Sequence, residues 1–555
     1  MIVPTHNVRP WIRETLGTVL AQRDGDMEVI VVDDHSTDGT VEIIEDLARA
    51  NPALRLVTAA VRGGGSARNE GVAQARGRYL IFCDGDDLVP DGAYAALVES
   101  LEASGSDIAF GDFLKFSPTE TWRPTAAWPA YSQGRTRFTA EEVPSILYGR
   151  ACWNKAFRRT FWDRSGAMFP DVPRSNDIVP MTMCYLAASA IDMVDDIVYL
   201  YRERQGATSM SSRAANAESL LSYFEQELAC ADLVAAAESS ELSTVFSSLV
   251  LDRDGWVHLA RYLRESERRA EDDERVRAVL ARLVSASGHD VDDIGLPHKR
   301  LVFTLALAGE FEAAAGLARV TSGPPSEIAD QLTSWIAFLT ATSRAGTAVL
   351  REEPWLVRLV AEMLAAAVVE GSDETDRLAL DLASIAILQD TSVLEDVPEL
   401  HGFTGADAAD RTTAFAAARR AAASVIRVGS GRRLELMATQ GAETRGSLVL
   451  FDPDDGSIVT APGTSTADGR AFVRFPARAI PAGTRFVIAH RDDSSGAVHA
   501  ARFATAVPAY DRFDRFEVLQ RRTTLEIRRR RHWVSRAAAK GVMLLRRRFS
   551  TRSTS

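Results

Sequence analysis

The chain has 555 residues, a formal charge of −12 and 46% hydrophobic residues, which argues against wholesale disorder and predicts about three or four domains. No uncharged apolar run reaches the ~18 residues of a transmembrane helix, and residues 1–4 lack the pattern of a signal peptide. Four widely spaced cysteines contain no Cys-x-x-Cys pair, so neither a zinc ribbon nor a disulfide framework is indicated, and a reduced cytoplasm fits best.

Strands and helices alternate through the first 87 residues. Apolar, β-rich runs predict strands that end near residues 5, 32, 57 and 82. Apolar residues at helical spacing follow the first two, and Gly63-Gly64-Gly65-Ser66 leads into a helix through Ala75 after the third. This β-α-β-α-β order predicts an α/β domain with a doubly wound parallel sheet and helices on both faces. Ligands bind such sheets at the carboxyl ends of the strands. The polar segments 4–7, 33–38 and 84–87 are expected to meet there.

Cys83-Asp84-Gly85-Asp86-Asp87 follows the buried strand predicted at 79–82. Three adjacent carboxylates repel one another unless a cation lies among them, and Mg²⁺ or Mn²⁺ takes oxygen ligands that it often shares with substrate phosphates. The segment is therefore a candidate metal–diphosphate site. The alternative is a surface turn, because Asp and Gly are common turn residues.

Several segments together resemble the family-2 glycosyltransferases, which have the GT-A fold. They are Val-Pro-Thr-His-Asn (3–7), Val-Val-Asp-Asp-His-Ser-Thr-Asp-Gly-Thr (31–40), Ser-Ala-Arg-Asn-Glu-Gly (66–71), Gly-Arg-Tyr-Leu-Ile-Phe-Cys-Asp-Gly-Asp-Asp (77–87) and Trp-Asn-Lys-Ala-Phe-Arg-Arg (153–159). Their order and spacing match the family over about residues 1–210. We therefore expect a GT-A catalytic domain at residues 1–212.

The resemblance implies roles for residues on the donor side. Pro4, Thr5 and Asn7 would contact the nucleoside, and Asp34 would accept a hydrogen bond from its base. Arg68 would reach the base or the diphosphate; the alternative is an arginine on a helix surface.

The resemblance also implies a cofactor, Mn²⁺ or Mg²⁺. Asp86 would bind the ion directly, and Asp84 would bind the ribose or a water on the ion. The ion would bridge to the diphosphate and stabilise the leaving group. Arg202 or Arg204 could clamp that diphosphate. A histidine that some relatives carry near Arg204 is absent here, so no protein ligand to the metal is assigned in that segment.

The family usually places an acidic pair at the start of a helix after the Asn-Lys segment. Here the pair reads Asn176-Asp177, so Asp177 is the candidate general base for the acceptor hydroxyl. The alternative is an acid that stabilises the helix dipole.

Two further features differ from related enzymes: the start of the chain, and a segment typical of processive synthases. Only Met1 and Ile2 precede Val3-Pro4, so we expect a short first strand or a start upstream of Met1. The Gln-x-x-Arg-Trp segment of processive polysaccharide synthases is absent, which favours the addition of single sugars.

The remainder predicts three parts. Residues 213–423 read as a helical linker or docking domain, and short strands separated by turns predict a β-sandwich at 424–508, with a hairpin turn at 452–456. Residues 509–555 form a basic tail. From residue 521 onward it has twelve basic residues and one acid, a net +11, which leaves −23 on the rest of the chain.

The tail predicts a partner. A basic amphipathic helix suits an anionic membrane surface and would place the protein at the inner face of the cell membrane. Nucleic acid is the rival, which we do not expect, and a solvated disordered terminus is the other alternative.

The domain order resembles the wall teichoic acid glycosyltransferases. We expect a metal-dependent inverting glycosyltransferase that moves one sugar from a nucleotide-sugar to a hydroxyl of a cell-surface polymer or a lipid-linked glycan. The β-domain would bind acceptor or mediate homo-oligomerisation. The alternatives are a non-catalytic scaffold that binds a nucleotide-sugar or glycopolymer, and a nucleotidyltransferase, which fits segments 33–38 and 176–177 less well.

Overall fold

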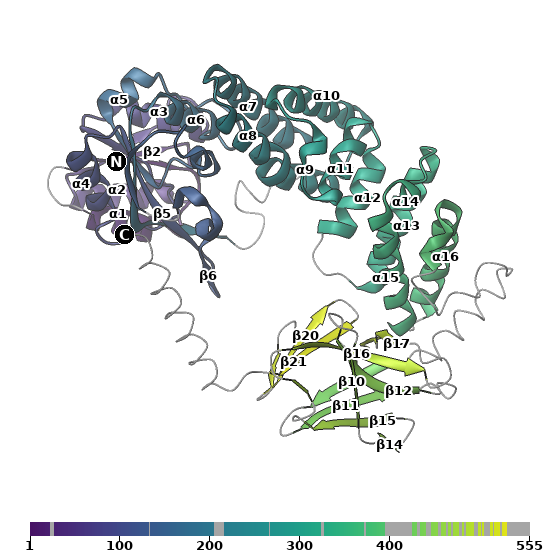
Figure 1. Cartoon of the computed structure of the whole chain (residues 1–555). Helices are drawn as coiled ribbons and strands as arrows, with labels where there is room; N and C mark the ends of the chain where they lie inside the picture. The colour runs from purple at the N-terminus through teal and green to yellow at the C-terminus, as the bar shows by residue number, and fades with distance from the viewer. Residues whose placement is uncertain are drawn as a thin grey trace, which may run out of the picture. The chain divides into compact units, whose positions relative to one another are not determined.

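The computed structural model describes residues 1–394 apart from gaps at 23–26, 132–133, 205–215, 266, 323–326 and 371–372, and then β10 to β21 with a few flanking residues. The chain divides into two compact units, Met1–Ser322 and Gly323–Ser555 (Figure 1). The predicted tail lies outside the described residues from 530 onward.

The first unit begins with three parallel strands in the order β1-β2-β3, alternating with helices. The elements are β1 (Ile2–Thr5), α1 (Ile12–Ala21), β2 (Val29–Asp33), α2 (Thr40–Ala50), β3 (Leu54–Thr58) and α3 (Gly64–Gln74). The first four residues of β2 are fully buried. A continuous apolar run of this kind is typical of a strand with both faces covered by helices.

A second sheet continues the core in the order β4-β8-β5-β9-β7, with β6 beside β5. The elements are β4 (Tyr79–Ile81), α4 (Ala93–Ser104), β5 (Ile108–Phe116), β6 (Thr121–Trp122), β7 (Arg135–Phe138), β8 (Lys155–Arg158), α5 (Arg159–Ser165), α6 (Ile178–Ala187) and β9 (Ile191–Arg202). A parallel bridge between Ile2 and Phe82 joins it to β1.

This second sheet is mixed, whereas the sequence predicted parallel strands. β8 runs antiparallel to both β4 and β5, and β9 runs parallel to β5. The chain reaches β8 from β5 through β6, three short 3₁₀ helices and β7. The described residues of this stretch form no α-helix of the βαβ type, the usual connection between parallel strands.

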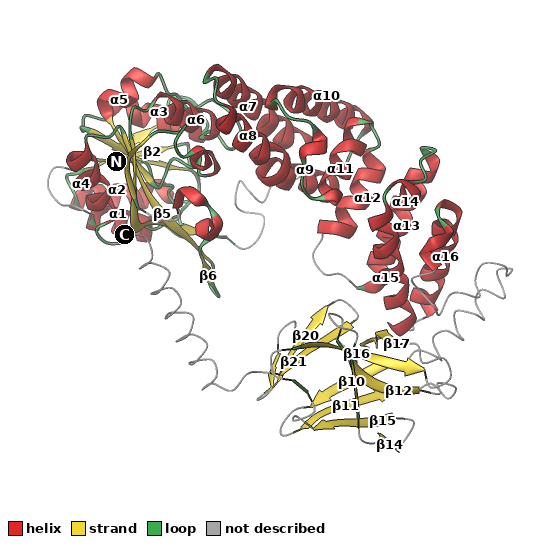
Figure 2. Cartoon of the chain, in the orientation of Figure 1, coloured by secondary structure: helices red, strands yellow, loops and turns green. Residues whose placement is uncertain are grey.

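Six helices, α7 to α12, belong to the same unit as the two sheets (Figure 2). They are α7 (Ala217–Ala236), α8 (Ser240–Ser248), α9 (Asp254–Glu265), α10 (Ala270–Ser287), α11 (Pro297–Leu307) and α12 (Phe311–Ser322). α7 packs against α6. Arg150 and Glu227 form a two-pronged ion pair at 2.7 and 2.6 Å, and their side chains are 4% and 0% exposed. The first helices after residue 216 are therefore built into the core of this unit.

The second unit contains α13 (Ile328–Arg344), α14 (Val349–Glu352), α15 (Pro354–Glu370) and α16 (Asp373–Gln389), followed by twelve strands in one hydrogen-bonded network. The strands are β10 (Ser424–Gly429), β11 (Arg433–Thr439), β12 (Gly446–Phe451), β13 (Ile458–Thr460), β14 (Thr464–Ala467), β15 (Arg470–Pro476), β16 (Arg485–Asp492), β17 (Val498–Ala500), β18 (Arg502–Phe503), β19 (Asp511–Phe513), β20 (Phe516–Arg521) and β21 (Thr524–Arg529). β12 and β13 pair antiparallel, and the Asp452 N–H donates to the Ser457 carbonyl at 2.9 Å, as a hairpin at the predicted turn requires. The helical region and the β-rich part follow in the predicted order, and the predicted domain boundaries stay a prediction.

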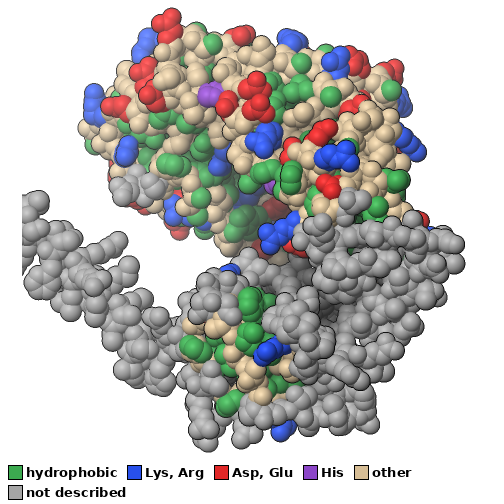
Figure 3. All heavy atoms as spheres, turned by 45° about the vertical axis from the view of Figure 1, so that its right-hand side comes forward, with side chains coloured by type: hydrophobic (Ala, Val, Ile, Leu, Met, Phe, Trp, Pro, Cys, Tyr) green, Lys and Arg blue, Asp and Glu red, His purple; other side chains and the backbone are tan. Residues whose placement is uncertain are grey.

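Among the described residues, no helix is both long enough and apolar enough to cross a membrane. Acidic and basic side chains are interspersed over the described surface drawn in Figure 3, with hydrophobic side chains between them.

Candidate active site

Polar side chains tie the ends of β1 and β2 together. Asp33 is 2% exposed, and its carboxylate accepts a hydrogen bond from the Thr5 hydroxyl at 3.0 Å. Asn7 has a left-handed backbone with φ of 50°, and its side-chain oxygen accepts from the Thr37 N–H at 2.9 Å. Because the Thr5 hydroxyl donates its proton to Asp33, it has none left for a nucleoside. This arrangement fits the expectation that Pro4 and Thr5 act partly through their backbone.

Asp34 presents one carboxylate oxygen that no described residue satisfies. Oδ2 accepts from the Gly63 N–H at 2.9 Å, whereas Oδ1 is buried without a hydrogen-bond partner among the described residues. A buried acceptor left in this state costs about 1–3 kcal/mol. A donor N–H on a ligand base would satisfy Oδ1.

The Asp84 segment folds back over the end of β1. A Cβ at Gly85 would lie 2.9 Å from Cγ2 of Thr5 and 3.2 Å from the Pro4 carbonyl oxygen, so the close approach requires glycine. The segments 4–7 and 84–87, far apart in the chain, therefore meet as predicted.

Asp87 holds this segment against β9. It is 1% exposed and accepts hydrogen bonds from the Tyr199 hydroxyl at 2.8 Å and the Arg202 backbone N–H at 2.7 Å. Burial raises the pKa of Asp87 well above its usual value, and the neighbouring Asp86 and Asp84 raise it further. The segment thus forms a turn at Gly85 and Asp86 that Asp87 holds against β9.

Arg68 joins the Asp84 segment to the loop before α6. Its Nη2 donates to Asp84 Oδ1 at 2.5 Å, and its Nη1 donates to Asn176 Oδ1 at 2.8 Å. The guanidinium lies 5.6 Å from the ring centre of Phe169, and the residue is only 7% exposed. Arg68 is thus a buried bridge between two loops, and the alternative of a helix-surface arginine is wrong.

Both arginines of the predicted basic segment lie at Asp86. Arg204 donates to the Asp86 carboxylate through Nε at 2.6 Å and through a second guanidinium N–H, and it lies 4.2 Å from the ring centre of Trp11. Arg202 donates from Nε to the Asp86 carbonyl at 2.8 Å and from Nη2 to Glu14 at 2.7 Å. Burial raises the pKa of Asp86, although Arg204 opposes that shift.

The donor set around Asp84 and Asp86 fits a cation shared with a substrate. No group of three or more His, Cys, Asp or Glu side chains that could hold a metal occurs within the described ranges. Mg²⁺ is commonly held by one or two carboxylates together with substrate phosphates. Two carboxylates next to two arginines match that pattern, because the arginines can bind phosphate oxygens.

Asp177 stands at the N-cap of α6, as predicted, but its side chain makes no capping hydrogen bond. Burial raises the pKa of this carboxyl and Asp84 raises it further, while Arg68 and Lys155 oppose the shift. These interactions place Asp177 in the same electrostatic cluster as Asp84 and Arg68. A carboxylate with a raised pKa suits proton abstraction near neutral pH.

Lys155 supports this cluster from inside the domain. It is fully buried, and its Nζ donates to the Ala151 carbonyl at 2.5 Å and to Asn154 Oδ1 at 2.6 Å. Burial lowers the pKa of Lys155 to about 7. Asn154 and Lys155 belong to a segment that carries the resemblance to the family, but no role was predicted for them from the sequence.

The sequence missed Tyr199, whose hydroxyl accepts from the Asp84 N–H at 3.0 Å and donates to Asp87. No local pattern distinguishes this tyrosine from other strand residues.

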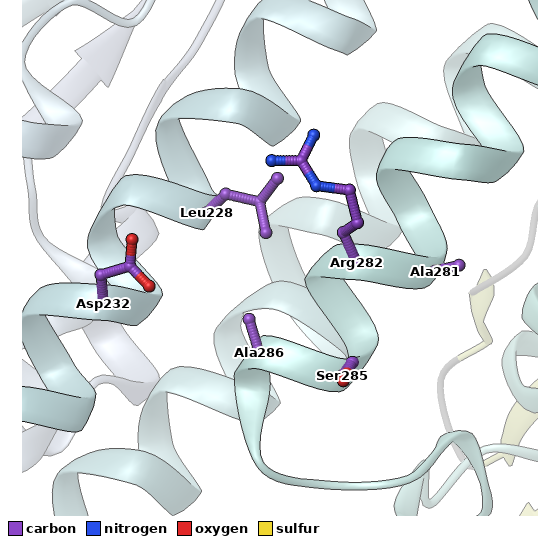
Figure 4. A pocket seen from close by; sticks show the side chains of 6 residues that line it. All are labelled: Leu228, Asp232, Ala281, Arg282, Ser285 and Ala286. Atoms are coloured by element: carbon purple, nitrogen blue, oxygen red, sulfur yellow. The ribbon is translucent and has the colours of Figure 1, made fainter.

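A separate shallow groove between α7 and α10, lined by Leu228, Asp232, Ala281, Arg282, Ser285 and Ala286, contains none of the predicted site residues (Figure 4).

Comparisons with known proteins identify several to which the chain is similar. Residues 1–164 match the model of glycosyl transferase family 2. The chain is 30% identical over 237 residues to the glycosyltransferase EpsJ of Bacillus subtilis, covering 41% of this chain and 68% of EpsJ. It is 27% identical over 227 residues to the poly(ribitol-phosphate) beta-N-acetylglucosaminyltransferase TarS of Staphylococcus aureus, covering 39% of this chain and 38% of TarS. The crystal structure of S. aureus TarS 1–349 with UDP-GlcNAc is 22% identical, covers 57% of this chain and 89% of that one, and gives a TM-score of 0.46.

The family match and the similarity to EpsJ show that the chain is a glycosyltransferase. The chain belongs to glycosyl transferase family 2. The predicted GT-A-type core followed by a helical region is confirmed.

Proposed function

We propose that this chain is a metal-dependent, inverting glycosyltransferase. It moves one sugar from a nucleotide-sugar, preferably a UDP-sugar, to a hydroxyl of a cell-surface polymer such as teichoic acid or of a lipid-linked glycan. The observation that carries the proposal is the buried Arg68, which donates to Asp84 at 2.5 Å and to Asn176, the neighbour of Asp177, at 2.8 Å. The similarity to a poly(ribitol-phosphate) transferase supports a polymer acceptor.

The residues of this cluster take separate roles in the reaction. Asp34 accepts from the base of the nucleotide, and Arg202 and Arg204 hold the diphosphate. The acceptor oxygen bonds to the anomeric carbon while the bond from that carbon to the diphosphate breaks, and Asp177 receives the hydroxyl proton. The bonding electrons leave with the nucleoside diphosphate, and attack from the opposite face inverts the anomeric centre.

Asp86 and Asp84 would hold Mg²⁺ or Mn²⁺. The ion would offset the negative charge that develops on the leaving diphosphate. Asn7, Pro4 and Thr5 would border the nucleoside at the end of β1.

Replacing Asp86 by asparagine is expected to weaken Mn²⁺-dependent binding of UDP by at least about tenfold, because a charged ligand to the ion is lost. Calorimetric titration of UDP with Mn²⁺ and with a chelator measures the effect. Asp46→Asn is the matched control, since Asp46 is an exposed acid on α2 paired with Arg49. Equal Mn²⁺-dependent affinity in Asp86→Asn and Asp46→Asn would refute the role of Asp86.

The remaining parts of the chain would bring the enzyme to its acceptor. The basic tail at 509–555 would attach it to the anionic inner face of the membrane, where lipid-linked acceptors reside. The β-domain would bind acceptor or a second copy of the chain. Binding of the full chain to vesicles of phosphatidylglycerol, and its loss on removal of residues 530–555, tests the membrane role.

A further inference from the structure

Arg174 lies three residues before Asp177 and is fixed against α7. Its Nη1 donates to the Ser219 hydroxyl at 3.1 Å, and its carbonyl oxygen accepts from Gln226 Nε2 at 3.0 Å. Its Nε is buried without a hydrogen-bond partner, and no described carboxylate forms an ion pair with it. The guanidinium therefore keeps an unmatched donor and an uncompensated charge next to the loop that carries Asp177.

Helix α9 brings His258 to the same stretch of α7. The His258 ring stacks on Tyr223, with ring centres 3.9 Å apart and planes inclined by 29°. Tyr223 follows Ser219 by one helical turn, so His258 and the Arg174 guanidinium lie over adjacent turns of α7. The two side chains come from segments more than 80 residues apart in sequence.

Arg261 completes the group from the same face of α9, three residues after His258. It forms a long ion pair of 3.9 Å with Glu265. Burial lowers the pKa of Arg174, and Arg261 lowers it further. Burial lowers the pKa of His258 to about 3, and both arginines act in the same direction. Arg174 and Arg261, the latter paired with Glu265, thus lie near a neutral imidazole, and a bound anion would stabilise the positive charge there.

We propose that Arg174, His258 and Arg261 form a binding site for a phosphate group of the acceptor. Guanidinium N–H groups match the spacing of phosphate oxygens, and a neutral imidazole adds one more N–H donor. The proposal deepens the proposed function and rests on it for the presence of an acceptor.

The position of the site explains why the acceptor supplies the phosphate. Three residues of chain span at most about 10 Å between Cα atoms, so Arg174 and Asp177 are near enough for both to contact one acceptor chain. The proposed function already assigns the donor diphosphate to Arg202 and Arg204, which lie at Asp86. A polyol-phosphate chain that passes along the loop would place a phosphate at Arg174 and a hydroxyl at the base.

Binding of inorganic tripolyphosphate to the full chain tests the site directly. Arg174→Gln and Arg261→Gln are each expected to weaken tripolyphosphate binding by about tenfold, because each removes a charge-assisted contact. Arg282→Gln is the matched control, since Arg282 is an exposed arginine on α10 that pairs with Glu225 at 3.2 Å. Arg174→Lys, which keeps the charge, should lose less affinity than Arg174→Gln and replaces it if that variant fails to fold.

Two competitors identify the source of the phosphate. A glycerol-phosphate oligomer should displace tripolyphosphate, and saturating UDP with Mn²⁺ should not. Displacement by UDP would assign the anion to the donor site, and failure of the oligomer to compete would leave a site for free phosphate only; either result overturns the proposal. Unchanged affinity in both glutamine variants overturns it as well. Release of nucleotide from a donor sugar is measured separately. If the protein releases none, that result contradicts the proposed function and not the phosphate site.

Discussion

Replacing Asp177 by asparagine is expected to lower sugar transfer by about 10²- to 10⁴-fold while the protein stays folded. Asparagine keeps the size of the side chain but cannot accept the acceptor proton. The Asp177 carboxylate makes no capping hydrogen bond at the start of α6, so the substitution removes no cap. Initial rates of transfer at saturating donor measure the effect, and the far-ultraviolet circular dichroism spectrum verifies the fold.

The pH dependence of transfer gives a second readout on the same residue. Burial raises the pKa of Asp177, so the base becomes protonated, and activity falls, at a higher pH than an ordinary aspartate near 3.9 would allow. This acid limb should disappear from the residual activity of Asp177→Asn. Asp171→Asn is the control, because Asp171 is an exposed acid in the same loop. If Asp171→Asn lost most of its transfer activity and Asp177→Asn lost none, Asp177 would not be the general base.

Replacing Glu227 by alanine is expected to destabilise the first unit by about 3–5 kcal/mol, because the substitution leaves Arg150 charged and unpaired in the interior. Both side chains are almost fully buried, and the pair links the segment before β8 to α7. Since α7 also packs on α6, we expect the loop that carries Asp177 to loosen in the same variant.

Chemical denaturation of the full chain, read at the transition of the first unit, measures this loss. Glu225→Ala is the matched control, since Glu225 lies on the same helix but is half exposed and pairs with the exposed Arg282. An exposed pair contributes about 0–1 kcal/mol, so the control should change little. Equal effects of the two substitutions would contradict a structural role for α7 in the catalytic unit. Arg150→Met combined with Glu227→Leu should recover much of the stability, because no buried charge remains.

The strand-end rule explains why much of the site could be predicted from sequence. Segments 4–7 and 84–87 end neighbouring strands, and the close approach of Gly85 to Thr5 brings them together. The meeting of these segments depends on local patterns and on one general property of α/β sheets. The position of Asp177 at the start of a helix followed instead from the resemblance to the family-2 glycosyltransferases.

Other features depend on contacts that no local pattern encodes. The Tyr199 hydroxyl reaches Asp84 and Asp87 across more than 100 residues, and Arg68 reaches Asn176 across 108. The antiparallel direction of β8 depends on the path of the chain after β5. The contact of Arg174 with α7 arises because the helices that follow the sheets pack into the same unit. Sequence periodicity shows that such helices exist but not which loop they support.

The release of nucleotide from purified full-length protein tests the central claim most directly. The protein would be incubated with UDP-, GDP- and CDP-sugars in the presence of Mn²⁺ or Mg²⁺, with and without a chelator. We expect release from one class of donor, preferably a UDP-sugar, that stops when the ion is removed. Undiminished release in the chelator would contradict the metal-dependent mechanism. Silence with every donor, even when a glycerol-phosphate oligomer is supplied as acceptor, would contradict the proposed transferase activity itself.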